Sequence, residues 1–274
     1  MNDLPIRRSL TPAYILSLFV ALLMSFTALG SILYQTTIYP SANLRYVFVA
    51  TDAGNLLIAL PLLLVSLWLT YRGNIMGLLC WPGALFYVLY VYVPYLIAIP
   101  FNLFFPAYLL LIPLSGIGIF YIMANIDGVA IRRRFIDQAP ARTAAGILVG
   151  LSVLIILRQS ILMVTALMNQ TTVDIQELAL WIDDFALAVP LMLISGILLW
   201  RREPLGFVTA PALLVAYGFL SIGLVPVMIV QAYSLDTTID TVGIAVVLVM
   251  AAICLVPFAL FFRRNRTNKK EKKS

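Results

Sequence analysis

One segment of this chain occurs twice, at a fixed offset of 129 residues. Between residues 59–85 and 188–214, ten of the 27 aligned pairs are identical and no gap is needed. Matching leucines carry little weight in so apolar a chain, but matching prolines, glycines and cations do. The informative pairs are Pro61/Pro190, Ser66/Ser195, Arg72/Arg201, Gly77/Gly206 and Pro82/Pro211. The repeat predicts two homologous halves with the same arrangement of helices.

The composition predicts where these halves reside. Apolar residues make up 62% of the 274-residue chain and charged residues only 11%, whereas soluble domains have about 25% charged residues. Several apolar stretches reach the roughly 20 residues needed to cross the hydrocarbon core of a bilayer. We therefore predict an all-α integral membrane protein with the lipid bilayer as its surroundings.

Eight transmembrane helices are expected. The predicted spans are 12–34, 47–70, 78–99, 103–124, 144–166, 179–200, 208–232 and 241–262. Four spans in each half preserve the orientation of that half, so the two four-helix repeats are predicted to be parallel rather than inverted. The predicted organisation is a first repeat at 1–124, a linker at 125–143, a second repeat at 144–262 and a polybasic tail at 263–274.

The placement of cations predicts the orientation. Sixteen of the 18 basic residues fall on the side of the two termini; of the others, Arg45 lies on the opposite side and Arg158 inside a span. Cytoplasmic segments are enriched in Lys and Arg. We expect a multi-pass protein of the plasma membrane with cytoplasmic N- and C-termini, whose basic tail contacts anionic lipids.

The repeated segment itself is interpreted as scaffold. Pro61 and Pro190 fall inside spans, where proline kinks a helix. Each of these helices then ends at an aromatic residue and a cation, at positions 71–72 and 200–201, which is typical of a membrane-interface anchor. A ligand-binding loop at this turn is the alternative interpretation.

Candidate functional residues lie where the two halves differ. Ionisable side chains inside a span are costly and suggest function by default. The first candidates are Arg158, Asp183 and Asp184, and the second-rank candidates are Gln159, Asp52 and Asn55. Two interpretations remain open. In the first, the role is structural: Arg158 and Asp184 form a pin between helices, or Arg158 extends to the outer headgroups. In the second, the cluster lines an outward-facing polar cavity that binds a small solute, an ion or a lipid headgroup.

The sequence gives no signature of an enzyme. The chain has no histidine, which argues against histidine-based metal sites and acid–base relays. It contains no common nucleotide-binding or hydrolase motif. We expect no catalytic residue, cofactor, metal or nucleic-acid partner, and an enzymatic role is disfavoured. The oligomeric state is left open.

Segments 60–68, 71–73, 81–90 and 190–206 resemble a family of prokaryotic polytopic membrane proteins that has no assigned activity. The resemblance covers most of the chain and implies a multi-pass membrane fold, but it transfers no functional residue. The cluster around Arg158, Asp183 and Asp184 is the basis for our functional expectation, a protein that binds or transports a small solute or lipid through an outward-facing polar cavity. The alternative is a structural or accessory membrane protein that transports nothing.

Overall fold

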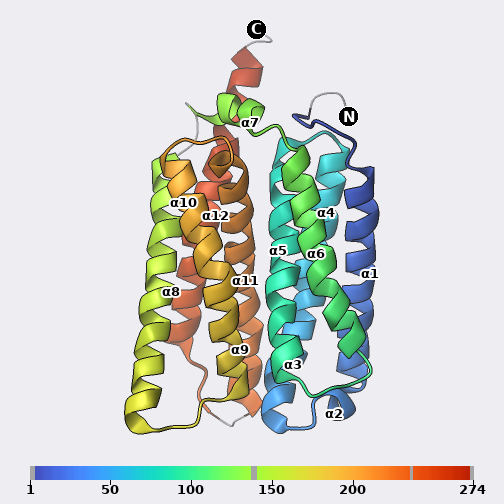
Figure 1. Ribbon diagram of the computed structural model, residues 1–274, viewed down its shortest axis with the longest axis vertical. Helices are drawn as coiled ribbons and strands as arrows, with labels where there is room; N and C mark the ends of the chain where they lie inside the picture. The colour runs from blue at the N-terminus through green and yellow to red at the C-terminus, as the bar shows by residue number, and fades with distance from the viewer. Residues whose placement is uncertain (1–3, 137–140, 235–236, 272–274) are drawn as a thin grey trace.

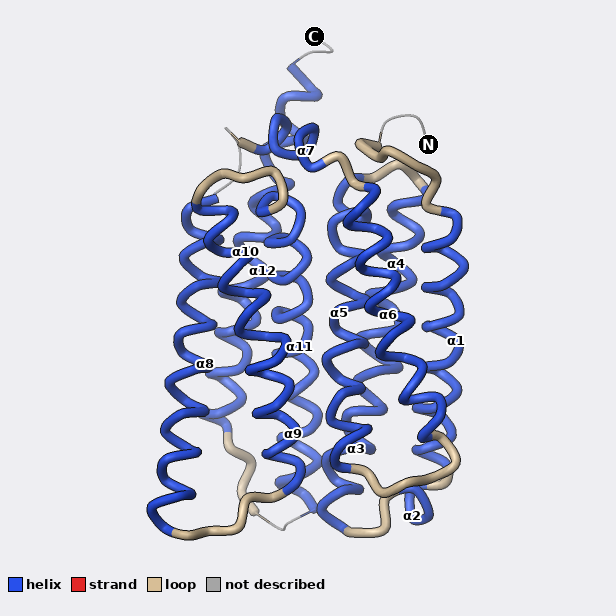
Figure 2. Tube along the Cα trace, viewed as in Figure 1, coloured by secondary structure: helices blue, strands red, loops and turns tan. Residues whose placement is uncertain are grey.

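The computed structural model describes residues 4–136, 141–234 and 237–271, of which residues 234 and 262–271 are described by their backbone alone. Every regular element in this part of the chain is helical (Figures 1 and 2). The elements are α1 (Thr11–Leu33), α2 (Gln35–Ile38), α3 (Ala42–Gly54), η1 (Asn55–Ala59), α4 (Leu60–Tyr71), α5 (Ile75–Ala98), α6 (Phe105–Asn125), α7 (Gly128–Phe135), α8 (Ala141–Asn169), α9 (Ile175–Asp183), η2 (Asp184–Ala188), α10 (Val189–Trp200), α11 (Gly206–Ser234) and α12 (Thr241–Glu271).

Eight helical segments are long and apolar enough to cross a membrane, as the sequence predicted. α3, η1 and α4 form one continuous span, Ala42–Tyr71, and α9, η2 and α10 form another, Ile175–Trp200. Figure 1 shows two groups of upright helices, α1 to α6 on the right and α8 to α12 on the left. Both termini lie at the same end of the bundle, which we call the terminal end; the opposite end is the distal end.

α5 is the central helix of the bundle. Inside the protein, 83% of its apolar window is buried, compared with 17% for α8. α5 packs against α4 and α6 of its own group and against α9 and α11 of the other group. Side chains on opposite faces of α5 therefore reach different groups of helices.

Two helix backbones of different groups come close together where Gly83 of α5 faces Ala212 of α11. A Cβ atom on Gly83 would collide with the backbone carbonyl of Ala212. Small residues at such a contact let two helix backbones approach closely, which is a common basis of helix association in membranes.

The two prolines expected to kink their helices are each preceded by one turn of π-helix. The amide of Leu60 donates to the carbonyl of Asn55, and that of Val189 donates to the carbonyl of Asp184. Pro61 and Pro190 follow directly. A proline ring clashes with the carbonyl four residues earlier in a regular α-helix, so a widened turn at this point relieves the clash.

The spans that contain Pro61 and Pro190 end in the same kind of turn. Gly73 has φ +75° and Arg202 has φ +57°. The amide of residue 73 donates to the carbonyl of residue 70, and the amide of 202 donates to that of 199. A left-handed residue that closes a helix in this way is usually glycine, so Arg202 holds a conformation unfavourable for its side chain.

The predicted linker at 125–143 contains the short helix α7. Asp127 caps this helix, because its carboxylate accepts hydrogen bonds from the amides of Val129 and Ala130. Ile131 and Phe135 are buried, whereas three consecutive cations form the last turn. Residues 137–140 and the side chains of the polybasic tail lie outside the described residues.

Candidate functional site

Three carboxylates are buried in the distal half of the bundle. Asp52 and Asp183 are 0% exposed and Asp184 is 7% exposed. Asp52 lies on α3 shortly before η1, whereas Asp183 ends α9 and Asp184 begins η2. A buried carboxylate is costly unless hydrogen bonds or a cation offset the lost hydration, so the partners of each acid decide its interpretation.

Asp52 is fully satisfied by tyrosines. The hydroxyl of Tyr39 donates to one of its carboxylate oxygens at 2.6 Å, and that of Tyr95, on α5, donates to the other at 2.8 Å. Tyr39 lies between two spans, and burial, together with the nearby Asp52, raises the pKa of Tyr39 far above its ordinary value. Its hydroxyl therefore keeps its proton and remains a donor.

More tyrosines surround this pair. The ring of Tyr95 lies 4.9 Å from that of Tyr92 and 5.2 Å from that of Tyr108, between centroids. Thr27 and Ser31 of α1 share hydrogen bonds with the hydroxyls of Tyr92 and Tyr108. This network links α1, α3, α5 and α6, and its donors and acceptors are matched, as expected of a structural pin.

Asp184 has two donors from different elements. The hydroxyl of Tyr90, on the opposite side of α5, donates to Oδ1 at 2.8 Å, and the side-chain amide of Gln159 on α8 donates to Oδ2 at 2.6 Å. Asp184 thus connects α8 with α5 and contributes to the contact between the two groups of helices. Charge-assisted hydrogen bonds of this kind are stronger than neutral ones.

Asp183 differs from both other acids. Neither of its carboxylate oxygens has a hydrogen-bond partner among the described residues. Two neighbouring polar atoms are also without a partner in that part of the chain: Oε1 of Gln159, on the amide that binds Asp184, and the hydroxyl of Tyr217, whose ring lies 6.2 Å from that of Tyr90. Unpartnered buried polar atoms are few in native proteins and each needs an explanation.

Arg158 does not join these acids. Its side chain is exposed on α8, and no described carboxylate lies within ion-pair distance. Successive residues of an α-helix point about 100° apart, so Gln159 faces inward to Asp184 while Arg158 faces outward. The expected pin between α8 and Asp184 is therefore formed by the residue after Arg158.

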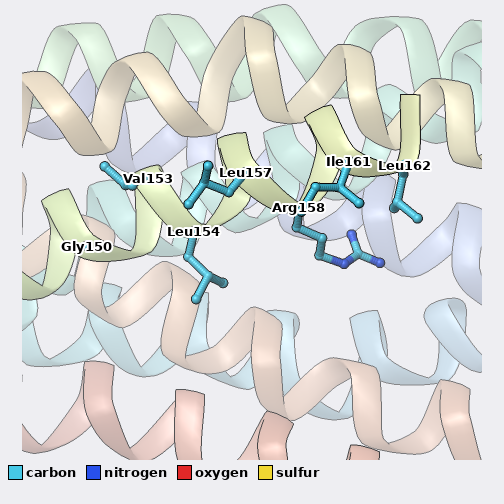
Figure 3. Close-up of a pocket in the computed structure, with 7 residues that line it drawn as sticks. All are labelled: Gly150, Val153, Leu154, Leu157, Arg158, Ile161 and Leu162. Carbon is cyan, nitrogen blue, oxygen red and sulfur yellow. The ribbon is translucent and has the colours of Figure 1, made fainter. Parts of the chain in front are cut away.

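Arg158 instead lines a groove of about 560 Å³ along α8. Figure 3 shows its guanidinium pointing away from the helix, on the side to which Leu154 and Leu162 also point. A second cavity, of about 280 Å³, is lined by Gln35, Arg45, Tyr46, Val49 and Val230. Neither of these two cavities is lined by a carboxylate.

The remaining candidate, Asn55, is buried at the start of η1, and neither atom of its amide group has a partner among the described residues.

Sequence reasoning missed the tyrosine donors. Tyr90 and Tyr95 belong to a tyrosine-rich span that the sequence displays, but only the packing shows that they face different acids. Tyr39 had no signal, because it lies in a connection.

The chain matches no family model, no curated protein and no solved structure. The resemblance to a family of prokaryotic membrane proteins therefore stays a prediction, and the function has to be argued from the geometry.

Proposed function

We propose that this protein binds a small cation, in the simplest case a proton, at Asp183 and Asp184, as the binding step of a transport-type function. The observation that carries the proposal is Asp183, a fully buried carboxylate with no hydrogen-bond donor in the described part of the chain. An ionised carboxylate in such a place costs several kcal/mol, of the order found for a broken buried ion pair. A bound proton or cation removes that cost.

The surroundings of Asp183 suit this role. The adjacent Asp184 adds a second acid, and the free oxygens of Gln159 and Tyr217 add uncharged acceptors. Single π-helical turns are frequent at functional sites, and η2 begins at Asp184. Because the carboxylates are closed off in this conformation, release of the cation requires movement. The π-turn followed by Pro190 is a natural place for α9 to move relative to α10.

The proposal includes two parallel four-helix repeats. Three observations support it: η1 and η2 start 129 residues apart, Gly73 and Arg202 occupy equivalent turns, and Gly83 packs against its own equivalent, Ala212. A residue that contacts its equivalent lies near a local two-fold axis. The amide of Asn43 on α3 also bonds Asp174 at the start of α9, at the distal ends of equivalent helices.

The two acids of the cation site occur in the second half of the repeat and have no counterpart at the equivalent positions of the first half. At the positions of Asp183 and Asp184, the first half has Gly54 and Asn55. We propose that the first half shares the scaffold but has neither of these two acids, so that only the second half binds the cation. With the termini in the cytoplasm of a prokaryotic cell, the acids face the outer half of the plasma membrane, as the excess of cations at the terminal end supports.

A binding measurement on the purified full chain tests the proposal. Infrared spectra recorded during a pH titration detect the carbonyl band of a protonated carboxyl group, and thermal unfolding in sodium, potassium or choline salts at equal ionic strength detects a bound metal cation. We expect one of these signals in the wild type and its loss in Asp183→Asn. Asp52→Asn is the matched control and should keep the signal. A wild type with neither signal would refute the proposal.

A structural role is the second candidate, and the Asp52 network favours it. There, every carboxylate oxygen has a tyrosine donor and nothing is left to bind a ligand. If Asp183→Asn and Asp184→Asn change stability alone, with no change in cation or proton uptake, the protein is better described as an accessory membrane protein held together by buried acids.

A further inference from the structure

The groove along α8 is a feature that the cation site does not use. Its lining residues are Gly150, Val153, Leu154, Leu157, Arg158, Ile161 and Leu162, all from α8. Apart from Arg158 every side chain in it is apolar (Figure 3). The groove volume of about 560 Å³ lies within the range of about 300 to 1,000 Å³ that small-molecule sites occupy.

This face of α8 is directed away from the protein. Of the apolar window of α8, only 17% is buried, and Val153, Leu154, Leu157 and Ile161 are exposed. Exposed apolar side chains in a transmembrane segment contact lipid or another protein chain. The groove is therefore filled by one of these two in the membrane.

Arg158 distinguishes between lipid and another protein chain as the occupant of the groove. Its guanidinium has no acceptor among the described residues, and a lone cation at membrane depth is costly. It lies 11 residues before Asn169, the end of α8, which corresponds to about 16 Å along a helix. It is thus in the distal half of the span, where a long side chain extends toward the headgroup layer.

We infer that the groove binds an anionic phospholipid of the distal leaflet, with its phosphate on Arg158 and an acyl chain along Leu154 toward Gly150. The order of the lining residues fits this orientation. Four lining residues, from Leu157 to Gly150, lie on the terminal side of Arg158, so an acyl chain along them points to the membrane centre. Ile161 and Leu162 lie on the distal side of Arg158, past which its long side chain extends toward the headgroup layer. The charge of Arg158 complements a phosphate, and the apolar residues complement a hydrocarbon chain.

A second copy of the chain fits less well. A symmetric contact would use the same patch on both copies. The patch carries one cation and no acid, so such a contact would bury two arginines without a counter-charge.

Gly150 provides a variant that closes the groove without disturbing the fold. A Cβ atom on Gly150 would meet nothing within 4 Å, and leucine is a better helix former than glycine. Gly150→Leu therefore places a side chain in the path of the acyl chain. Arg158→Gln removes the charge at an exposed position. Arg142→Gln, which removes an exposed cation from the same helix outside the groove, is the matched control.

Native mass spectrometry of the full chain, titrated with phosphatidylglycerol and phosphatidylcholine of identical acyl chains, tests the inference. We expect Arg158 to contribute a preference for phosphatidylglycerol of about fivefold, the factor associated with one cation near an anionic lipid. Arg158→Gln should lower the preference of the wild type by this factor and leave the contribution of the basic terminal end, Gly150→Leu should weaken the binding of both lipids, and Arg142→Gln should leave the part that depends on Arg158 unchanged.

Four results would overturn it. The first is an unchanged lipid preference in Arg158→Gln, and the second is undiminished binding in Gly150→Leu. The third is competition by inorganic phosphate as effective as that by phosphatidylglycerol, which would make the site one for a free anion. A dimer linked through a cysteine at position 158 would equally overturn it, because a second copy would then occupy the groove.

Discussion

The hydroxyl of Tyr90 on α5 donates a 2.8 Å hydrogen bond to Asp184 at the start of η2, across the contact between the two groups of helices. Five residues further along α5, Tyr95 donates at the same distance to Asp52 within its own group. One helix thus supplies a tyrosine to an acid on each side of it, which makes α5 the element that couples the two groups.

Tyr90→Phe should destabilise the protein by about 1.5 to 3 kcal/mol, the range for a hydrogen bond to a charged group. A double-mutant cycle with Asp184→Asn, followed by unfolding in a mixed-detergent titration, measures the coupling. We expect the two effects to be non-additive, because Tyr90→Phe removes the bond that Asp184→Asn weakens by taking away the charge of its acceptor. The control pair is Tyr95→Phe with Asp184→Asn, whose effects on the free energy of unfolding should add. If these effects are coupled too, the coupling does not report the bond between Tyr90 and Asp184.

Asp183→Asn should raise stability at alkaline pH, whereas Asp52→Asn should lower it, each by roughly 1 to 3 kcal/mol. Asp183 has no donor to lose, and a neutral amide is less costly to bury than an unpaired charge. Asp52 loses a carboxylate that accepts bonds from Tyr39 and Tyr95. Thermal unfolding of the three proteins in parallel provides the comparison. Equal destabilisation by both changes would count against a functional Asp183.

The turns at residues 73 and 202 allow two opposite substitutions that test the same backbone strain. Gly73→Ala should cost roughly 1 kcal/mol, because φ +75° disfavours any side chain. A Cβ there meets no atom within 4 Å, so the cost comes from the backbone alone. Arg202→Gly should stabilise the protein by up to about 1 kcal/mol for the same reason. Midpoints of thermal unfolding report both, and a loss of stability in Arg202→Gly would be inconsistent with the strain.

Gly83 and Gly150 form a matched pair of helix glycines. Gly83→Ala should cost about 1 to 3 kcal/mol, because the added methyl group overpacks the contact with Ala212. Gly150→Ala should gain up to about 1 kcal/mol from helix propensity. Equilibrium unfolding of both variants checks the prediction. If both variants gained stability, the close approach of α5 and α11 would not contribute to the fold.

Orientation can be tested with single cysteines, because the native Cys80 and Cys254 are buried. A membrane-impermeant maleimide added to intact cells should label Thr172→Cys at the distal end and leave Arg201→Cys unlabelled until the cells are opened. External labelling at position 201 would reverse the proposed topology.

Much of the fold follows from the sequence alone. Runs of apolar residues longer than a bilayer is thick can satisfy their backbone only as helices, so the eight spans follow from composition and length. The repeat at offset 129 located the two prolines and the turns after them. It did not show that each proline follows a π-turn, because the choice between a kink and a widened turn depends on how neighbouring helices satisfy the displaced carbonyls.

The candidate site depended on tertiary structure. The sequence named Arg158, Gln159 and Asp184 as candidates, but the rotation of α8 about its axis decides which of two adjacent residues faces inward. The packing of α8 against α10, α11 and α12 sets that rotation. Gln159 therefore reaches Asp184, and Arg158 faces outward from the bundle. The acids could be named from the sequence because charge is rare in a span. Their partners could not, because Tyr39, Tyr90 and Tyr95 come from distant segments that only the assembled bundle brings together.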